Sequence, residues 1–287
     1  MKLYLAGIKS YQLDRGIECT AFADPRHERT IQGIKRDHKE AETRTRTPLT
    51  RPCLLRILRY LPGFTYNDLV ARAAFTLAFA GFLTVGEFTY QPTDSVPEYT
   101  FKNWFMVNDS IRMREGGRYM EVILPASKTD PFRKGITLTI SASEDDSCPV
   151  KAMRQFLAVD TDRAAHSPLF CIGQLEQQAF TREYVVQRLQ QLARTAGLGQ
   201  GTWNGHSLRR GAATWTARVG ISEAEIQTLS RWSSDAYRAY IEYSDRERSH
   251  YLSASRLRKP QPASHRCEPA SIWVGDVTHR TAGQFQL

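Results

Sequence analysis

The sequence lacks a long apolar run and a pattern of paired cysteines. Its most apolar stretch, residues 69 to 88, includes the charges of Arg72 and Glu87, so we expect a buried core helix there rather than a membrane span. The N-terminus also lacks the apolar segment of a signal peptide. The five cysteines are odd in number and scattered, which argues against a disulfide framework and favours free thiols in a reducing compartment.

Acidic residues are in deficit. The 287 residues include 39 lysines and arginines against 30 aspartates and glutamates, for a formal net charge of +9. This excess favours a polyanionic partner, because each Lys or Arg contact with a phosphate releases counterions. A membrane surface would also attract the chain, but no basic amphipathic segment with bulky apolar anchors is visible. His265 and Cys267 have no further ligands nearby, so we expect no metal.

The most informative residues follow one another in the C-terminal third. His206-Ser-Leu-Arg209 precedes Trp232 and Tyr240. His206 and Arg209 are three residues apart on one expected helix, so both side chains can reach a single phosphate. The planar fork of arginine binds two phosphate oxygens and keeps its proton, and an indole can only donate. These residue types suit attack on a phosphodiester, where additional negative charge develops.

This series resembles the active site of a tyrosine recombinase. The resemblance covers roughly residues 1 to 250. The local sequence of residues 205–211 and 231–241 is most similar to that of the Crypton or DIRS recombinases of eukaryotic mobile elements. It implies that Tyr240 is the nucleophile and forms a 3′-phosphotyrosyl bond with DNA, leaving a free 5′-hydroxyl. Because a free phenol has a pKa of about 10, Tyr240 needs a proton acceptor, and His206 is the candidate.

The resemblance also implies a cellular role and partners. It predicts DNA recombination and integration in the nucleus, with double-stranded DNA as the partner and a homo-tetramer that works on two duplexes. It implies no metal or nucleotide cofactor. The lack of an apolar span and of a basic amphipathic segment predicts no membrane partner.

A hairpin is expected between residues 119 and 140. The second arm alternates apolar and polar residues, and the Pro, Asp and Gly content between the arms is typical of a turn. Lys128 would then lie on an exposed loop, where most lysines are merely solvated. However, Ser127-Lys128-Thr129 is similar to the hairpin segment of the family, whose lysine protonates the leaving 5′-oxygen. We therefore expect Lys128 to have this role.

The sequence departs from the family at one catalytic position. The segment Phe82-Leu-Thr84-Val-Gly-Glu87 has Thr84 at the position where the family carries an arginine. Glu87 is expected to brace the site or cap backbone amides. Loss of one preorganised donor costs about 2.7 to 4 kcal/mol of transition-state stabilisation, so we expect slow cleavage. Arg133, Arg210 and Arg231 are possible substitutes, although Arg210 points about 100° away from Arg209 on an ideal helix.

Three functional classes remain open. The first is an active recombinase, and the second is a catalytically dead, domesticated DNA-binding descendant of one. The third is a basic helical protein with an unrelated RNA or protein partner. The nucleophile also has an alternative, because Tyr237 and Tyr243 lie close to Tyr240 in the sequence. The spacing from Trp232 favours Tyr240, with Tyr237 in reserve.

The expected fold is mainly α with a small antiparallel β hairpin or sheet, an α+β arrangement. Residues 1–43 would form a partial helical core-binding domain that lacks its first helices, 44–52 a basic linker, 53–256 the integrase-like catalytic domain and 257–287 a loose tail. Besides the catalytic residues, the arginines expected to contact DNA are Arg44, Arg46, Arg51, Arg133 and Arg210.

Helix ends are marked by glycines and by one cap. An apolar stripe through Val185 and Leu189 ends at Gly197, and a second stripe beginning at Leu208 ends at Gly220. Ser222-Glu-Ala-Glu225 is a capping-box pattern that opens the next helix. Near the N-terminus, Asp24-Pro25 separates two expected helices.

Overall fold

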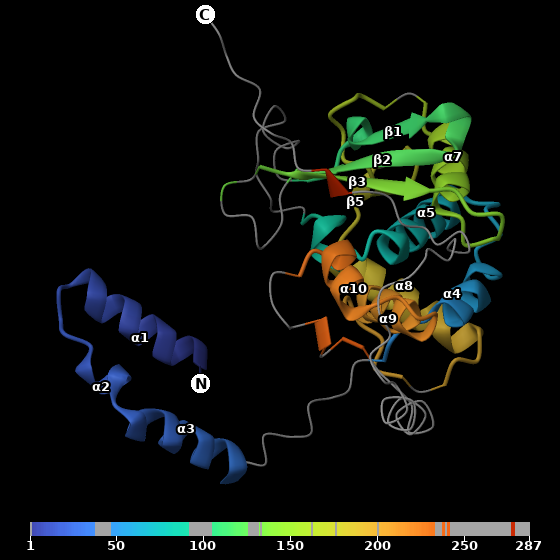
Figure 1. Ribbon diagram of the computed structural model, residues 1–287. Helices are drawn as coiled ribbons and strands as arrows, with labels where there is room; N and C mark the ends of the chain where they lie inside the picture. Colours follow the sequence, from blue (N-terminus) through green and yellow to red (C-terminus); the bar gives the residue numbers. More distant parts are fainter. Residues whose placement is uncertain are drawn as a thin grey trace, which may run out of the picture. The chain divides into compact units, whose positions relative to one another are not determined.

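The computed structural model describes residues 2–37, 47–91, 105–125, 132, 134–161, 163–175, 177–199, 201–232, 237–238, 240–241 and 277–278. The chain divides into two compact units, Met1–Thr45 and Arg46–Leu287 (Figure 1). Within the described residues, no helix is both long enough and apolar enough to cross a bilayer.

The described residues of the first unit form helices joined by short turns. The helices are α1 (Lys2–Asp14), α2 (Thr20–Ala23) and α3 (Pro25–Asp37). Pro25 occupies the first position of α3, where its missing N–H costs nothing, and Oδ1 of Asp24 accepts a hydrogen bond from the backbone N of Arg26 at 2.8 Å. The predicted break at Asp24-Pro25 is confirmed, and the short helix α2 was not anticipated.

The second unit is built around α5 (Tyr66–Ala80). This helix begins at Thr65, whose side chain accepts from the backbone N of Asp68 at 3.1 Å. It contacts α7 (Pro149–Val159) and α9 (Ser207–Arg218). The other helices are α4 (Arg51–Leu58), α8 (Arg182–Thr195) and α10 (Glu223–Ser230), with 3-10 turns η1 (Val85–Glu87), η2 (Asn108–Ser110) and η3 (Glu115–Gly117).

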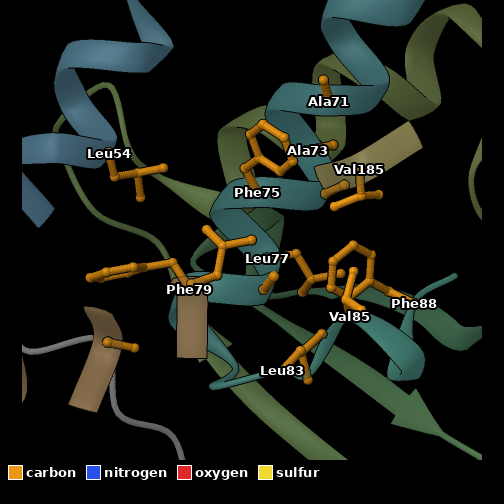
Figure 2. Packing of buried hydrophobic residues seen from close by; sticks show 14 of the residues in the cluster. Leu54, Ala71, Ala73, Phe75, Leu77, Phe79, Leu83, Val85, Phe88 and Val185 are labelled. Carbon is orange, nitrogen blue, oxygen red and sulfur yellow. The ribbon is translucent and has the colours of Figure 1, made fainter. Parts of the chain in front are cut away.

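The core surrounds α5 and the segment that follows it. Phe75 and Leu77 are fully buried, and they continue into the buried side chains of Leu83, Val85 and Phe88. Figure 2 shows these side chains packed together, with Leu54 of α4 and Val185 of α8 at the same cluster. The apolar stretch that begins at Leu69 is therefore a core helix, as the charges within it predicted.

A small antiparallel sheet contacts α7 through its third strand. Its strands are β1 (Ile111–Arg114), β2 (Tyr119–Leu124), β3 (Ile136–Ser141) and β6 (Val277–Thr278), in the order β1-β2-β3-β6 (Figure 1). The register pairs Leu124 with Ile136 and Met120 with Ile140, which confirms the hairpin. Strands β4 (Cys171–Ile172) and β5 (Gln178–Ala179) form a second sheet. The sequence indicated neither this sheet nor β6, which lies in the expected loose tail.

The predicted helix ends are confirmed. Helix α8 ends at Thr195 and α9 at Arg218, and Gly197 and Gly220 follow with φ of 63° and 91°. This left-handed region suits glycine. At the start of α10, the backbone N of Ser222 donates to Oε2 of Glu225 at 3.0 Å, and Ser222 Oγ accepts from the backbone N of Glu225 at 3.3 Å.

Candidate active site

The first turn of α9 is held in place by backbone contacts. The N–H of Leu49 donates to the carbonyl of Ser207 at 2.9 Å. A Cβ at Gly211 would lie 1.8 Å from the carbonyl oxygen of Leu49, so only glycine allows α9 to approach this segment so closely. The N–H of His206 donates to Oδ1 of Asn204 at 2.9 Å. These contacts fix the direction in which His206 and Arg209 leave the helix.

Tyr240 lies next to His206. The phenol oxygen is 3.3 Å from Nδ1 of His206, and the donor of this hydrogen bond depends on the imidazole tautomer. The two rings meet edge to face, with centroids 6.0 Å apart. The hydroxyl of Thr214, on the same helix α9, donates to the main-chain carbonyl of Tyr240 at 3.1 Å. When Nδ1 carries no proton, His206 is therefore placed to accept the phenolic proton.

Trp232 joins Tyr240 to Arg209. Its ring centroid is 4.8 Å from that of Tyr240, and the guanidinium carbon of Arg209 lies 4.5 Å from the Trp232 ring. The two arrangements fall within the ranges of favourable aromatic and cation–π contacts. The structure thus brings together His206, Arg209, Trp232 and Tyr240, although they come from three separate segments of the chain.

Arg209 is buried and strongly hydrogen-bonded. Only 6% of the residue is exposed. Its Nη1 donates to the carbonyl of Phe82 at 2.7 Å and its Nη2 to the carbonyl of Ser230 at 2.6 Å. Burial lowers the pKa of Arg209 to about 10, against the opposing effect of the Glu87 carboxylate. The side chain therefore remains cationic at neutral pH.

Thr84 and Glu87 form a cap on η1. The Glu87 Oε2 accepts from the backbone N of Thr84 at 2.5 Å and from its hydroxyl at 2.9 Å. The other oxygen of Glu87 accepts from Nη2 of Arg231 at 3.1 Å. Arg231 also donates from Nη1 to the carbonyl of Gly81 at 2.9 Å. Glu87 therefore links position 84 to the residue directly before Trp232.

Tyr237 occupies a different environment from Tyr240. It is 3% exposed, and its hydroxyl donates to Oε2 of Glu223 at 2.9 Å. The Nε of Arg238 donates to the same hydroxyl at 3.3 Å. Of the two tyrosines, only Tyr240 has its hydroxyl against His206 within the described residues. Tyr243 lies outside them.

The remaining predicted residues are only partly described. Lys128, Arg44, Arg46 and Arg133 lie outside the described residues. Arg51 forms an ion pair with Asp145. Burial opposes ionisation of Asp145, but hydrogen bonds from Ser147 and the Arg51 guanidinium together hold its pKa below the ordinary value. The guanidinium carbon of Arg210 lies 5.9 Å from the Tyr240 ring, which is within cation–π range.

Two contacts of the site were missed by sequence reasoning. Thr214 was not singled out as a support for Tyr240, because a buried helical threonine carries no pattern of its own. Arg231 was named only as a possible substitute cation, and its ion pair with Glu87 was not foreseen. Its position immediately before Trp232 was the available signal. Within the described residues, no cluster of three or more His, Cys, Asp or Glu side chains is arranged to hold a metal ion.

Comparison with solved structures identifies the fold. No protein-family model and no curated protein sequence matches the chain. The structure is similar to that of XerH site-specific recombinase bound to difH substrate in a pre-cleavage complex, with a TM-score of 0.50 and 15% identity over 74% of this chain and 53% of that chain. It is also similar to XerA recombinase, with a TM-score of 0.50 and 17% identity over 76% of this chain and 67% of that one.

At these identities, the likeness establishes the fold. The chain has the fold of tyrosine recombinase catalytic domains, mostly helical with small antiparallel sheets, as the sequence predicted. It spans about half the length of the XerH chain that it matches.

Proposed function

We propose that this protein binds double-stranded DNA and acts as a tyrosine recombinase or integrase, with Tyr240 as its nucleophile. The observation that carries the proposal is the 3.3 Å contact between the Tyr240 phenol and His206 Nδ1, beside the buried cation of Arg209. The similar XerH structure is a complex with its DNA substrate, which supports the same class of partner here.

The chemistry is a transesterification. The Tyr240 oxygen attacks the phosphorus, a bond from oxygen to phosphorus forms, and the bond from phosphorus to the 5′-oxygen breaks. His206 takes the phenolic proton, and Arg209 stabilises the charge that develops on the non-bridging oxygens. Lys128 donates a proton to the leaving 5′-oxygen. Attack by a 5′-hydroxyl reverses the steps, so the bond energy is conserved and no nucleotide is consumed.

The biological setting extends this proposal. The local sequence around His206 and Trp232 supports descent from a eukaryotic mobile element of the Crypton or DIRS type. The protein would then act in the nucleus as a homo-tetramer on two duplexes. The helical unit Met1–Thr45 would contribute to DNA binding as a partial core-binding domain. Imaging of a fluorescent fusion tests the nuclear location, and light scattering of the DNA complex tests the assembly.

A second candidate is a DNA-binding protein that no longer cleaves. The observation in its favour is Thr84, which has no positive charge and whose hydroxyl is bound to Glu87. The rate of cleavage then depends on whether another guanidinium meets the phosphate. This candidate predicts salt-sensitive binding to duplex DNA that Tyr240→Phe does not change.

The test uses a pool of nicked suicide duplexes with randomised sequence around the nick, so that it requires no chosen target site. Protein–DNA adducts that resist detergent are separated by electrophoresis. The proposal predicts adducts with the wild-type protein and none with Tyr240→Phe. Tyr237→Phe is the matched control and should keep them. Adducts that persist in Tyr240→Phe would refute the assignment, and duplex binding without any adduct would favour the second candidate.

A further inference from the structure

Two guanidinium groups share one buried carboxylate at the site. The shortest distance to Glu87 is 3.6 Å for Arg209 and 3.1 Å for Arg231, and the three side chains are 8%, 10% and 11% exposed for Arg209, Glu87 and Arg231. Two positive charges meet one negative charge, which leaves a net charge of +1. The other hydrogen-bond acceptors of the two arginines, within the described residues, are uncharged main-chain carbonyls. A buried excess of positive charge is costly in the absence of an anion.

Arg231 also lies beside the position at which a cation is missing. Its Nη2 binds Oε1 of Glu87, while the backbone N and hydroxyl of Thr84 bind Oε2 of the same carboxylate. Its Nη1 binds the carbonyl of Gly81, three residues before Thr84. The C-terminal end of α10 therefore places the guanidinium of Arg231 next to the segment from Gly81 to Glu87, in which residue 84 is a threonine.

The backbone conformation of Arg231 indicates that its side chain has a functional role. Arg231 caps the C-terminus of α10 in the left-handed region, with φ of 60° and ψ of 36°. Glycine is the usual residue in this conformation, because a side chain strains it. The strain is present here in the residue that directly precedes Trp232. An arginine at such a position is consistent with a requirement for its guanidinium.

We propose that Arg231 contacts the scissile phosphate and supplies the guanidinium that position 84 lacks. The identity of the ligand as a DNA phosphate rests on the proposed function. A guanidinium has five N–H donors, so the bonds to Gly81 and Glu87 leave donors for a phosphate oxygen. One phosphate charge would balance the charge that Glu87 leaves uncompensated. Arg209 and Arg231 would then contact the phosphate together, with Glu87 holding both.

The alternative role for Arg231 is purely structural, as a brace for Glu87. The two roles differ in their response to an anion. A brace affects folding alone, whereas a phosphate ligand affects the affinity for phosphate itself. Arg231→Gly separates them, because glycine removes the guanidinium and suits the left-handed backbone.

The experiment measures binding of inorganic phosphate to the full chain through the thermal unfolding midpoint, which rises with the concentration of a ligand that binds the folded state. Sodium chloride keeps the ionic strength constant. We expect a saturable rise for the wild type, an affinity about tenfold lower for Arg231→Gly and substantial retention of binding in Arg231→Lys. Arg194→Ala, which removes an exposed arginine of α8, is the control and should match the wild type.

Two results would overturn the proposal. One is the absence of a saturable phosphate effect in the wild type, and the other is equal affinity in the wild type and Arg231→Gly. Neither depends on strand cleavage. Phosphate binding that requires Arg231 in a protein that forms no adduct would support this inference and refute the cleavage activity. Adducts that form equally well in the wild type and in Arg231→Gly would support the cleavage activity and refute this inference.

Discussion

The phenol of Tyr240 and the imidazole of His206 lie 3.3 Å apart within one chain. The carbonyl of Tyr240 is also held by Thr214 of α9, the helix that begins directly after His206. The expected nucleophile and its expected proton acceptor are thus placed by the same helix. In the proposed function, the nucleophile and its proton acceptor therefore come from the same chain.

Replacing His206 tests its role as proton acceptor. General-base catalysis contributes roughly 10²- to 10⁴-fold to a rate, so His206→Ala should slow adduct formation on a nicked duplex by about that factor. His166→Ala removes an exposed histidine of the same unit and should leave the rate unchanged. A time course of adduct formation gives both rates, and equal rates for the two variants would exclude His206 as the acceptor.

Positions 84 and 231 are expected to be interchangeable as sources of the cation. Arg231→Gly should slow adduct formation by roughly 10²- to 10³-fold, the effect of losing one preorganised donor. Adding Thr84→Arg to that variant should restore most of the rate, whereas Thr84→Arg alone should give a smaller gain. The four rates form a double-mutant cycle. Independent effects at the two sites would contradict the exchange.

Glu87 is expected to be essential for stability. Glu87→Gln leaves two buried guanidinium groups without their shared carboxylate, and removal of one partner from a buried ion pair costs about 3 to 5 kcal/mol. Urea denaturation measures this change in the free energy of unfolding. Glu121→Gln breaks a more exposed pair with Arg114 on the sheet and should cost about 1 kcal/mol or less. A small loss for Glu87→Gln would contradict the charge arrangement proposed for the site.

The partly buried side chain of Tyr66 should make the stability of the fold depend on pH in the alkaline range. Burial, reinforced by the charge of Asp160, raises the pKa of Tyr66 to about 12, above the value of about 10 expected in the unfolded chain. The contribution of Tyr66 to stability is therefore fully present below pH 10 and is lost as the pH rises through 12. Unfolding curves across this window should fall less steeply for Tyr66→Phe. An identical fall in both proteins would contradict the assigned shift.

Local signals in the sequence predicted much of the fold. Gly197 and Gly220 follow the ends of α8 and α9, because a left-handed residue at a helix end favours glycine whatever the tertiary context. Ser222 and Glu225 cap α10 through bonds that span only three residues. The β2–β3 hairpin was visible for the same reason, since the apolar and polar alternation of its second arm follows directly from strand geometry.

Contacts between distant residues were not predictable in this way. The Arg231–Glu87 pair joins positions 144 residues apart, and neither residue carries a local pattern that specifies the other. Strand β6 pairs with β3 across a similarly long separation. The proximity of His206 and Tyr240 was expected only through the resemblance to a family. Composition and periodicity alone do not determine which of several tyrosines meets the histidine.

The proposed function requires that Tyr240 forms the covalent bond to DNA. Mass spectrometry of the adduct identifies the linked residue, after digestion of the DNA with nuclease and of the protein with trypsin. The expected product is a tryptic peptide that carries a nucleotide through its 3′-phosphate on Tyr240. A nucleotide found on Tyr237, or no modified peptide under conditions in which the protein binds the duplex, would contradict it.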